Sequence, residues 1–332
     1  MKARTFFQFA GPSMAMMFAL MALPLCITFF LSMRNCTLAM ETVTQTQSGP
    51  FGTEEVVSQR AKIGADGKAI ESCQFVGLQY FRTVLGLEQK QQQSADSSAD
   101  TKPSNEFLVA LRFTLFYVLL TTPFILVIGF LLALGVNRAS KRVKGLFITA
   151  SLLPFIITPL VGALSIKWLF RDNGLIPHLL GLIGIQLHWM AQAWSAQLLI
   201  ILYGIWHVVP FSFIVLYAGL QSVPQEAIEA AHIDGATRWQ TLRYVTIPSL
   251  MPLLVFITMI HIMDAYRVFE PVLVLTQGAF TTSVQYLTYS ILLQENNPYK
   301  ASASSVLTLI GILVLLIPLL RKTWLEHKGE KI

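Results

Sequence analysis

Long apolar runs constrain this chain more than any other feature of its sequence. Six stretches have the roughly 20 apolar residues that crossing a bilayer requires. They lie at about 6–33, 107–136, 146–170, 196–220, 250–276 and 303–320. Hydrophobic residues make up 54% of the sequence and charged residues only 13%, a balance typical of integral membrane proteins. We therefore predict an all-α integral membrane fold with six transmembrane helices.

Two apolar segments have a possible interpretation other than a membrane span. Phe6 to Met33 could serve as a signal peptide, but its 28 residues exceed the apolar region of one, so we interpret it as a membrane helix. The weaker apolar stretch from Gly174 to Met190 contains Gly, Pro and His. We interpret it as an outer re-entrant or interfacial segment rather than a span.

Lys and Arg residues set the expected orientation, because cytoplasmic loops are enriched in them. With the N-terminus inside, the two short outer loops hold only Arg171 and Lys300. The cytoplasmic segments then hold Lys2, Arg4, Arg138, Lys141, Arg142, Lys144, Arg238, Arg243, Arg321, Lys322, Lys328 and Lys331. We therefore expect both the N- and C-termini in the cytoplasm. The net charge of +6 follows from this flanking pattern. No stretch combines clustered basic residues with aromatics as a nucleic-acid surface would, so no nucleic-acid partner is expected.

One long polar, helix-forming segment interrupts the apolar runs of the C-terminal half, beginning at Ser222. Ser222, followed three residues later by Gln225, predicts a capping box. Asp234 and Gly235 predict a sharp bend, since Gly supplies backbone freedom and Asp can cap the next helix. A second helix is expected from about Ala236. The segment should therefore present two short helices at an angle between two spans.

Three residue groups in this segment have the order and spacing of a known motif: Glu229-Ala230-Ala231, Asp234-Gly235-Ala236 and Ile247-Pro248. They resemble the EAA loop of ABC importer permeases, which in that family is the coupling helix that docks on the cytoplasmic ATPase subunit. The alternative is an ordinary amphipathic cytoplasmic loop. The resemblance implies that the residues of ATPase coupling are Glu229, Ala230, Ala231, Asp234, Gly235 and Ala236.

The resemblance covers roughly residues 105–320. Leu275-Thr276-Gln277-Gly278 is similar to the LTxGGP segment of carbohydrate permeases of the maltose and glycerol-phosphate kind. Ala279 and Phe280 replace the second Gly and the Pro of that segment. The resemblance thus points to carbohydrate uptake, with a departure in this one motif.

The family resemblance implies the type I ABC importer permease fold. It divides the chain into an N-terminal transmembrane helix (1–33), an extracytoplasmic, partly flexible loop (34–106), a permease core of five helices (107–320, with the coupling loop at 222–249) and a cytoplasmic tail (321–332). The long outer loop includes a low-complexity tail, Gln89 to Ser104, which accounts for the expected flexibility.

The resemblance also implies partners and a mechanism. The partners would be a second permease subunit of different sequence, two ATPase subunits and an extracytoplasmic solute-binding protein, in a bacterial cytoplasmic membrane. A carbohydrate or related polar solute would move inward by alternating access. This chain would bind no cofactor itself. ATP and Mg²⁺ would be held by the ATPase, since the sequence has no phosphate-binding GxxxxGK(S/T) segment.

Other function classes are less well supported by the sequence. No HExxH, no GxSxG and no Cys/His cluster with metal-ligand spacing occurs, so neither an intramembrane enzyme nor a metal site is expected. An ion-gradient secondary transporter is a stronger rival, although the inverted repeats and paired broken helices common in such proteins are not evident. An ABC importer for a non-sugar solute, such as a phosphoester, a polyamine or another organic ion, is the nearest alternative.

Ionisable residues at membrane depth are the candidates for a solute path, because such groups are costly in lipid and face a bundle interior or a wet cavity. His261, Asp264, Arg267 and Glu270 follow one another at intervals of three, which predicts a strip along one side of a helix. Internal ion pairing of Arg267 is one interpretation. In the other, carboxylate and imidazole groups bind solute hydroxyls. The candidate path residues are Asp264, His261, His207, Trp206, Phe211 and Arg267, the last as an orienting partner.

Two of the three cysteines lie in the long outer loop. Cys36 and Cys73 are on the side of the membrane where disulfides persist, and a bond between them would join the start of the loop to an amphipathic segment near Phe75. Two free thiols remain the alternative. Cys26, inside the first apolar stretch, is interpreted as a small hydrophobic residue.

Overall fold

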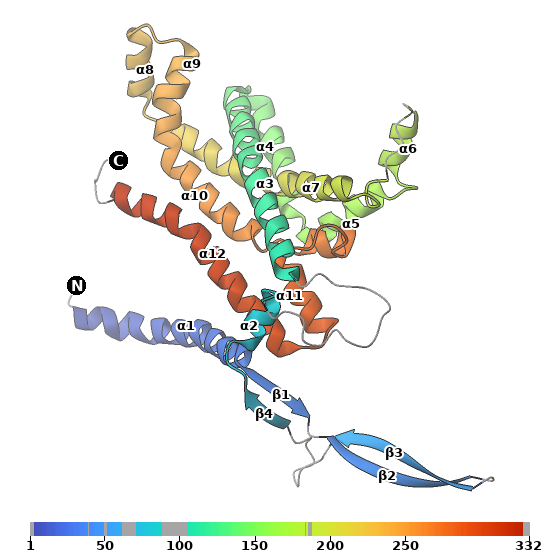
Figure 1. Cartoon of the computed structure of the whole chain (residues 1–332). Helices are drawn as coiled ribbons and strands as arrows, with labels where there is room; N and C mark the ends of the chain where they lie inside the picture. Colours follow the sequence, from blue (N-terminus) through green and yellow to red (C-terminus); the bar gives the residue numbers. More distant parts are fainter. Residues whose placement is uncertain are drawn as a thin grey trace. The chain divides into compact units, whose positions relative to one another are not determined.

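The computed structural model describes residues 3–38, 40–49, 52–61, 71–87, 105–182, 184 and 188–327 (Figure 1). The chain divides into two compact units. The first comprises Met1–Ser104 and Ile291–Leu307, and the second comprises Asn105–Ser290 and Thr308–Ile332. The segment predicted to be flexible, 89–104, lies outside the described residues.

The first unit begins with a long apolar helix and continues into strands. Its elements are α1 (Ala3–Ser32), β1 (Arg34–Leu38), β2 (Met40–Gly49), β3 (Gly52–Ala61), β4 (Glu71–Phe75) and α2 (Gln79–Val84). β1 pairs with β4 and β2 with β3, both antiparallel. Thr and Val recur in β2 and β3, and β-branched residues favour extended backbone. The sequence did not predict these strands, whereas α2 lies in the amphipathic segment expected near Phe75.

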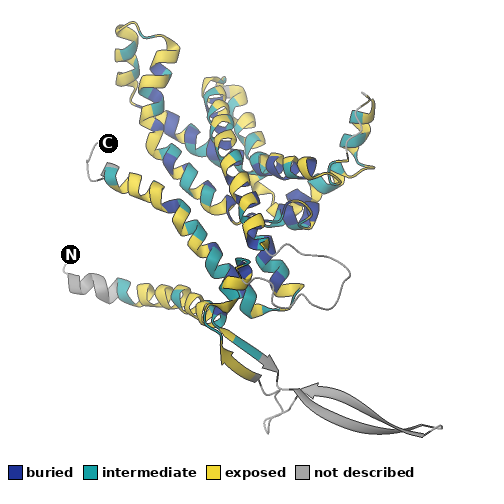
Figure 2. Ribbon diagram, viewed as in Figure 1, coloured by how far each residue is buried: buried dark blue, intermediate teal, exposed yellow. Residues whose placement is uncertain are grey.

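α1 exposes apolar side chains along its length. The most apolar part of its span, within 10–32, has no buried residue, and Phe18 is 72% exposed. Figure 2 shows this part of the helix largely in the colour of exposed residues. A helix that satisfies its own backbone hydrogen bonds and presents apolar side chains outward is suited to lipid. This agrees with its interpretation as a membrane helix.

A disulfide joins Cys36 of β1 to Cys73 of β4, which are opposite each other in the strand register. It closes a segment with a sequence separation of 37 residues, for which chain entropy gives about 3–4 kcal/mol of stabilisation. In a Cys26→Ser background we expect no maleimide labelling of the unfolded chain without reductant, and labelling of two thiols after reduction. Full labelling of both thiols before reduction would contradict the bond.

The second unit is helical, and its last two helices run across the division between the units. Its elements are α3 (Glu106–Arg138), α4 (Lys141–Ile156), α5 (Pro159–Phe170), α6 (Leu175–Leu182), α7 (Ala193–Ser222), α8 (Gln225–Ile233), α9 (Arg238–Thr241), the π-helix η1 (Leu242–Thr246), α10 (Ile247–Ala265), the π-helix η2 (Val272–Thr276), α11 (Val284–Leu293) and α12 (Pro298–His327).

α3, α7 and α10 form the core of this unit. Near one end, Phe213 of α7 and Ile257 of α10 are fully buried in one apolar cluster. In a second cluster, Tyr117 of α3 packs with Leu199 of α7. Gly204 allows the close approach of α3 and α7, because a Cβ there would collide with the Tyr117 ring. Close packing through small residues is a common way for membrane helices to associate.

The described residues contain five single helices long and apolar enough to cross a membrane. These are α1, α3, α7, the run from α9 through α10, and α12. The pair 142–156 and 159–182 provides a sixth if it counts as one span, but it bends by 95°. In the described residues, the six predicted spans are thus matched by five single helices and one broken pair.

The prediction of one continuous helix over 146–170 is wrong. α4 ends because Ile157 and Thr158 are extended, with ψ of 130° and 143°. Steric conflict with the ring of Pro159 disfavours the helical conformation of the residue before it. α6, within the stretch predicted to be re-entrant or interfacial, has only eight residues.

The fifth predicted span also ends early. α10 stops at Ala265, and the N–H groups of Arg267 and Val268 bond to carbonyls only three residues back, at 3.1 and 3.2 Å. Pro271 has no N–H to offer the carbonyl of Arg267, and its ring would clash with that carbonyl in a helix. The helix therefore gives way to a turn, and the chain resumes as η2.

This early end corrects the predicted strip. His261 and Asp264 lie on α10, whereas Arg267 and Glu270 lie beyond it. The four residues therefore do not share one face of a single helix.

Candidate functional site

The coupling loop, residues 222–249, folds as two short helices at one end of α10 (Figure 1). α8 ends in a turn in which Gly235 has φ +79°, a left-handed conformation that glycine adopts without strain. The N–H of Ala236 closes this turn on the carbonyl of Ala231 at 2.9 Å. The bend is therefore at Asp234-Gly235, where the sequence predicts it.

The helix caps of this loop differ from those predicted. The Ser222 hydroxyl donates to the carbonyl of Gly219, and α8 has Pro224 at its N-cap with no side-chain cap. Thr237, not Asp234, caps α9, in a capping box with Gln240. Both predicted caps are wrong because α7 extends through Ser222 and α9 begins later than expected.

The surface of the coupling loop is exposed in this single chain. Glu229, Ala230, Asp234 and Gly235 are exposed, and Ala231 and Ala236 are half-buried. Three large apolar or aromatic side chains accompany them: Ile233 is 86% exposed, Trp239 66% and Tyr244 69%. Sequence reasoning did not single out these three, although apolar residues within a polar loop are the signal of a docking surface.

A polar cluster lies between the spans, and His261 of α10 is a buried member of it. His261 is 2% exposed, and its Nε2 lies 3.0 Å from Oγ1 of Thr121 on α3. The Thr121 hydroxyl donates its hydrogen to the carbonyl of Tyr117 at 2.8 Å, so it accepts from Nε2. Neutral His261 therefore carries its proton on Nε2. Its Nδ1 is a buried acceptor with no hydrogen-bond partner among the described residues.

His207 of α7 contacts the break between α4 and α5. Its Nδ1 lies 2.9 Å from the carbonyl of Pro154, and because a carbonyl only accepts, Nδ1 carries the proton. The His207 ring stacks on Tyr203 with centroids 5.7 Å apart. The Tyr203 hydroxyl in turn donates to the carbonyl of Pro159 at 2.7 Å. These two side chains therefore satisfy carbonyls on both sides of the break.

Tyr117 of α3 supplies the carbonyl that accepts from the Thr121 hydroxyl. The Tyr117 ring packs against Gly204, the residue after Tyr203 on α7, and Asp264, about one turn after His261 on α10, is exposed. We call this set the midspan polar cluster, and its members are Tyr117, Thr121, Tyr203, His207, His261 and Asp264. Three of them were candidates from the sequence. The other three were missed, although each is a polar residue within an apolar helix.

The remaining path candidates are not members of this cluster, although the centroid of the Trp206 ring lies 6.1 Å from that of Tyr203. Trp206 is 41% exposed, and Phe211 is half-buried and stacks on Phe155 with centroids 6.1 Å apart. Arg267 is exposed, and no ion pair in the described part of the chain joins it to Asp264 or Glu270. The orienting role expected of Arg267 therefore has no contact to support it in this conformation.

Two members of the cluster lie midway along their helices, whereas His261 lies four residues before the end of α10. Thr121 is 15 residues from the start of α3 and 17 from its end, and His207 is 14 and 15 residues from the ends of α7. At about 1.5 Å per residue, each is roughly 20–25 Å from either end of its helix. Thr121 and His207 therefore fall at the depth where polar groups are most costly in lipid.

A lysine in the broken pair has a separate role. Nζ of Lys167 on α5 donates to the carbonyl of Val274 in η2 at 2.7 Å. A π-helix pairs its backbone differently from an α-helix, and this contact fixes η2 against α5. Sequence reasoning did not assign Lys167.

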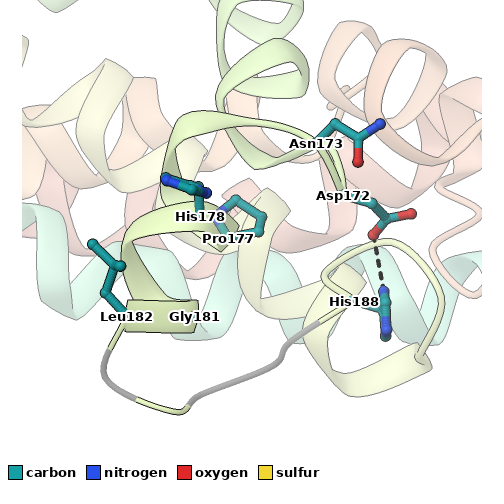
Figure 3. Close-up of a pocket in the computed structure, with 7 residues that line it drawn as sticks. All are labelled: Asp172, Asn173, Pro177, His178, Gly181, Leu182 and His188. Carbon is teal, nitrogen blue, oxygen red and sulfur yellow. Dashed lines mark hydrogen bonds and ion pairs between the residues drawn. The ribbon is translucent and has the colours of Figure 1, made fainter.

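A pocket of about 530 Å³ lies at the α5–α6 corner (Figure 3). Two of its lining residues, His188 and Asp172, point toward each other, with Nδ1 and Oδ1 3.0 Å apart, and both are well exposed. An exposed pair of this kind contributes little to stability. Within the described residues, no group of three or more His, Cys, Asp or Glu could hold a metal ion.

The sequence is similar to known transport proteins. The model of the family described as "Binding-protein-dependent transport system inner membrane component" matches residues 104–328. The arabinooligosaccharides transport system permease protein AraP of Halalkalibacterium halodurans is 31% identical over 233 residues, 68% of this chain and 73% of that protein. The trehalose/maltose transport system permease protein MalF of Thermococcus litoralis is 30% identical over 201 residues, 59% of this chain and 67% of that protein.

The fold is similar to a solved structure as well. A bacterial ABC transporter involved in the import of the acidic polysaccharide alginate has a chain that superposes with a TM-score of 0.64 at 24% identity, covering 75% of this chain and 83% of that one. At this identity the likeness concerns the fold alone. It agrees with the ABC importer permease fold that the sequence resemblance implies.

The family match spans the second unit and all of its apolar helices, and it includes both the coupling loop and the midspan polar cluster. This chain is therefore a multi-pass inner-membrane permease that belongs to the family of binding-protein-dependent transport system inner membrane components.

Proposed function

We propose that this chain is the transmembrane permease subunit of an ATP-driven importer for a carbohydrate or a closely related polar solute. The observation that carries the proposal is the midspan polar cluster, in a permease whose relatives are named for arabino-oligosaccharide and trehalose/maltose transport. The cluster offers a carboxylate, two imidazoles and two phenols. Such groups suit a ligand that presents many hydroxyls.

His261 and Asp264 are the residues proposed to bind solute hydroxyls. The unpartnered Nδ1 of His261 is a buried acceptor that costs about 1–3 kcal/mol while it has no donor. A solute hydroxyl would satisfy it in a conformation that opens the α3–α10 contact. Asp264, already exposed, would accept from a second hydroxyl. Trp206 and His207 would provide ring surfaces nearby.

The coupling loop is proposed to dock on the ATPase. Its two short helices carry the exposed side chains of Glu229, Ile233 and Trp239, which combine polar contact with apolar area as protein interfaces do. This assignment places the loop and both termini in the cytoplasm. ATP and Mg²⁺ would be held by the ATPase rather than by this chain.

The complete importer is proposed to contain a second permease subunit, two ATPase subunits and an extracytoplasmic binding protein. ATP binding would close the ATPase subunits, and their movement would pass through the coupling loop into α10. The solute site would then open to one side of the membrane and afterwards to the other. Such a mechanism needs a bistable helix bundle and a firmly anchored loop.

The test is transport by this chain reconstituted in vesicles together with its ATPase, a second permease and a binding protein. Uptake would be measured for labelled di- and oligosaccharides, glycerol phosphate and a polyamine, with and without ATP and with an ionophore. We expect sugar uptake that requires ATP and survives the ionophore. Uptake of the non-sugar solutes alone would overturn the substrate class, and uptake driven by the ion gradient would overturn the ATP-driven mechanism.

A further inference from the structure

A second pocket, of about 480 Å³, lies where the coupling loop joins the spans. Its walls come from the ends of α3 and α7, from α8, and from α9 and η1. Among the described residues that line it none is Asp or Glu, whereas two are arginines, Arg138 and Arg238. The imidazole of His232 and the amide of Asn137 add further possible hydrogen-bond donors.

The two arginines are unpaired among the described residues. In the part of the chain that the structure describes, neither guanidinium forms an ion pair or a hydrogen bond. The carbonyl ends of α3 and α7 each contribute about half a negative charge, and the start of α8 about half a positive one. Gln225, the first residue of α8, lines the pocket, and that helix has no side-chain cap. The pocket thus remains net positive and favours an anion.

Apolar side chains line the same pocket. Leu134 of α3, Leu220 of α7 and Ile228 of α8 line it. The arginine at the end of α3 and the short connection from α7 to α8 mark the level at which the spans leave the membrane. A pocket at that level, lined by both basic and apolar side chains, matches the boundary between a lipid head group and its acyl chains. Basic pockets between spans on the cytoplasmic side are known to bind phosphate-bearing lipid head groups.

We propose that this pocket binds the phosphate of one anionic phospholipid, with Arg138 and Arg238 as its ligands. Arg138 belongs to a span and Arg238 to the coupling loop. A phosphate held by both would fix the loop against α3. The lipid would therefore stabilise the contact between the coupling loop and α3, through which movement of the loop reaches the spans. This binding site does not depend on which solute is carried.

The test is native mass spectrometry of the full chain in detergent, titrated with phosphatidylglycerol, phosphatidylcholine or inorganic phosphate. We expect phosphatidylglycerol to bind and phosphatidylcholine to bind more weakly. The double variant Arg138→Gln/Arg238→Gln should weaken phosphatidylglycerol binding by roughly 30-fold, from about 1 kcal/mol per basic residue. The matched control Arg142→Gln/Arg321→Gln removes two exposed cations that do not line the pocket and should change binding less than about twofold.

Variants that keep the positive charges distinguish a loss of lipid binding from a loss of folding. Arg138→Lys/Arg238→Lys should keep most of the affinity, and circular dichroism should show unchanged helix content in all variants. Phosphatidylglycerol binding at the wild-type level in the Gln variant would overturn the proposal. Equal binding of phosphatidylcholine, or displacement of the lipid by millimolar inorganic phosphate, would show a site that does not select an anionic lipid. Loss of ATPase assembly without loss of lipid binding would assign the arginines to a partner's carboxylates instead.

Discussion

Gly235→Val is expected to reduce solute uptake by about tenfold or more in the assembled importer, while the basal ATPase rate persists. Gly235 has φ +79°, and a β-branched residue there costs roughly 1–2 kcal/mol or more. No atom lies within 4 Å of a Cβ at this position, so the variant would not clash with its surroundings. The cost would be relieved by a change in the turn between α8 and α9. If displacement of the docking surface weakens its binding to the ATPase by about 1.4 kcal/mol, the productive complex and hence uptake fall about tenfold.

Two variants make this prediction specific to backbone conformation. Gly235→Asn should retain most of the uptake, because Asn tolerates the left-handed region. Gly145→Val, in the exposed first half of α4, also has open space around its Cβ and should transport normally. The measurement is ATP-dependent uptake beside ATPase activity in vesicles, with membrane insertion checked by immunoblot. Wild-type uptake by Gly235→Val would remove the turn from the coupling role.

The sequence predicts the helices of this chain better than their interruptions. Apolar length locates the spans because lipid leaves the backbone no other way to satisfy its hydrogen bonds. The breaks at Pro159 and near Pro271 have local signals, since proline disfavours helix at the residue before it and blocks a carbonyl four residues back. Both prolines lie inside segments that were predicted as continuous spans from their apolar length, so neither break was predicted. The strip from His261 to Glu270 failed for this reason.

The strands of the first unit were missed for a different reason. Polar composition between two apolar runs predicts a loop, yet Thr and Val in alternating polar segments also favour strands. The register that sets Cys36 opposite Cys73 depends on residues 37 positions apart. Spacing alone leaves such a pairing open.

The midspan polar cluster was only partly predictable. The free-energy cost of placing ionisable side chains in lipid identifies His261, Asp264 and His207 as candidates from the sequence. The contact between His261 and Thr121 joins residues 140 positions apart, and only the packing of α3 against α10 reveals it. Threonine is easily tolerated in a membrane helix because its hydroxyl bonds the preceding turn, so Thr121 gave no signal of its own.

Asp264→Asn is expected to lower uptake by about 10- to 100-fold without loss of the assembled complex. The change keeps the shape of the side chain and removes its charge. Hydrogen bonds to charged groups contribute about 1.5–3 kcal/mol, which corresponds to that range. Asp264 is exposed in this chain, so its replacement should cost little stability. Wild-type uptake by this variant would show that the carboxylate does not bind solute.

His261 allows its two nitrogens to be tested separately. The side-chain amide of His261→Gln can take the place of Nε2 and keep the contact with Thr121, whereas that of His261→Asn falls nearer Nδ1. If Nδ1 accepts a solute hydroxyl, His261→Gln should assemble normally but transport at least about tenfold more slowly. His261→Asn should retain more transport but assemble less well. Thr121→Val leaves Nε2–H without its acceptor and should weaken assembly by about 1–3 kcal/mol. The opposite order, with His261→Gln transporting normally, would make His261 a purely structural contact between α3 and α10, and the solute site would then lie elsewhere in the importer.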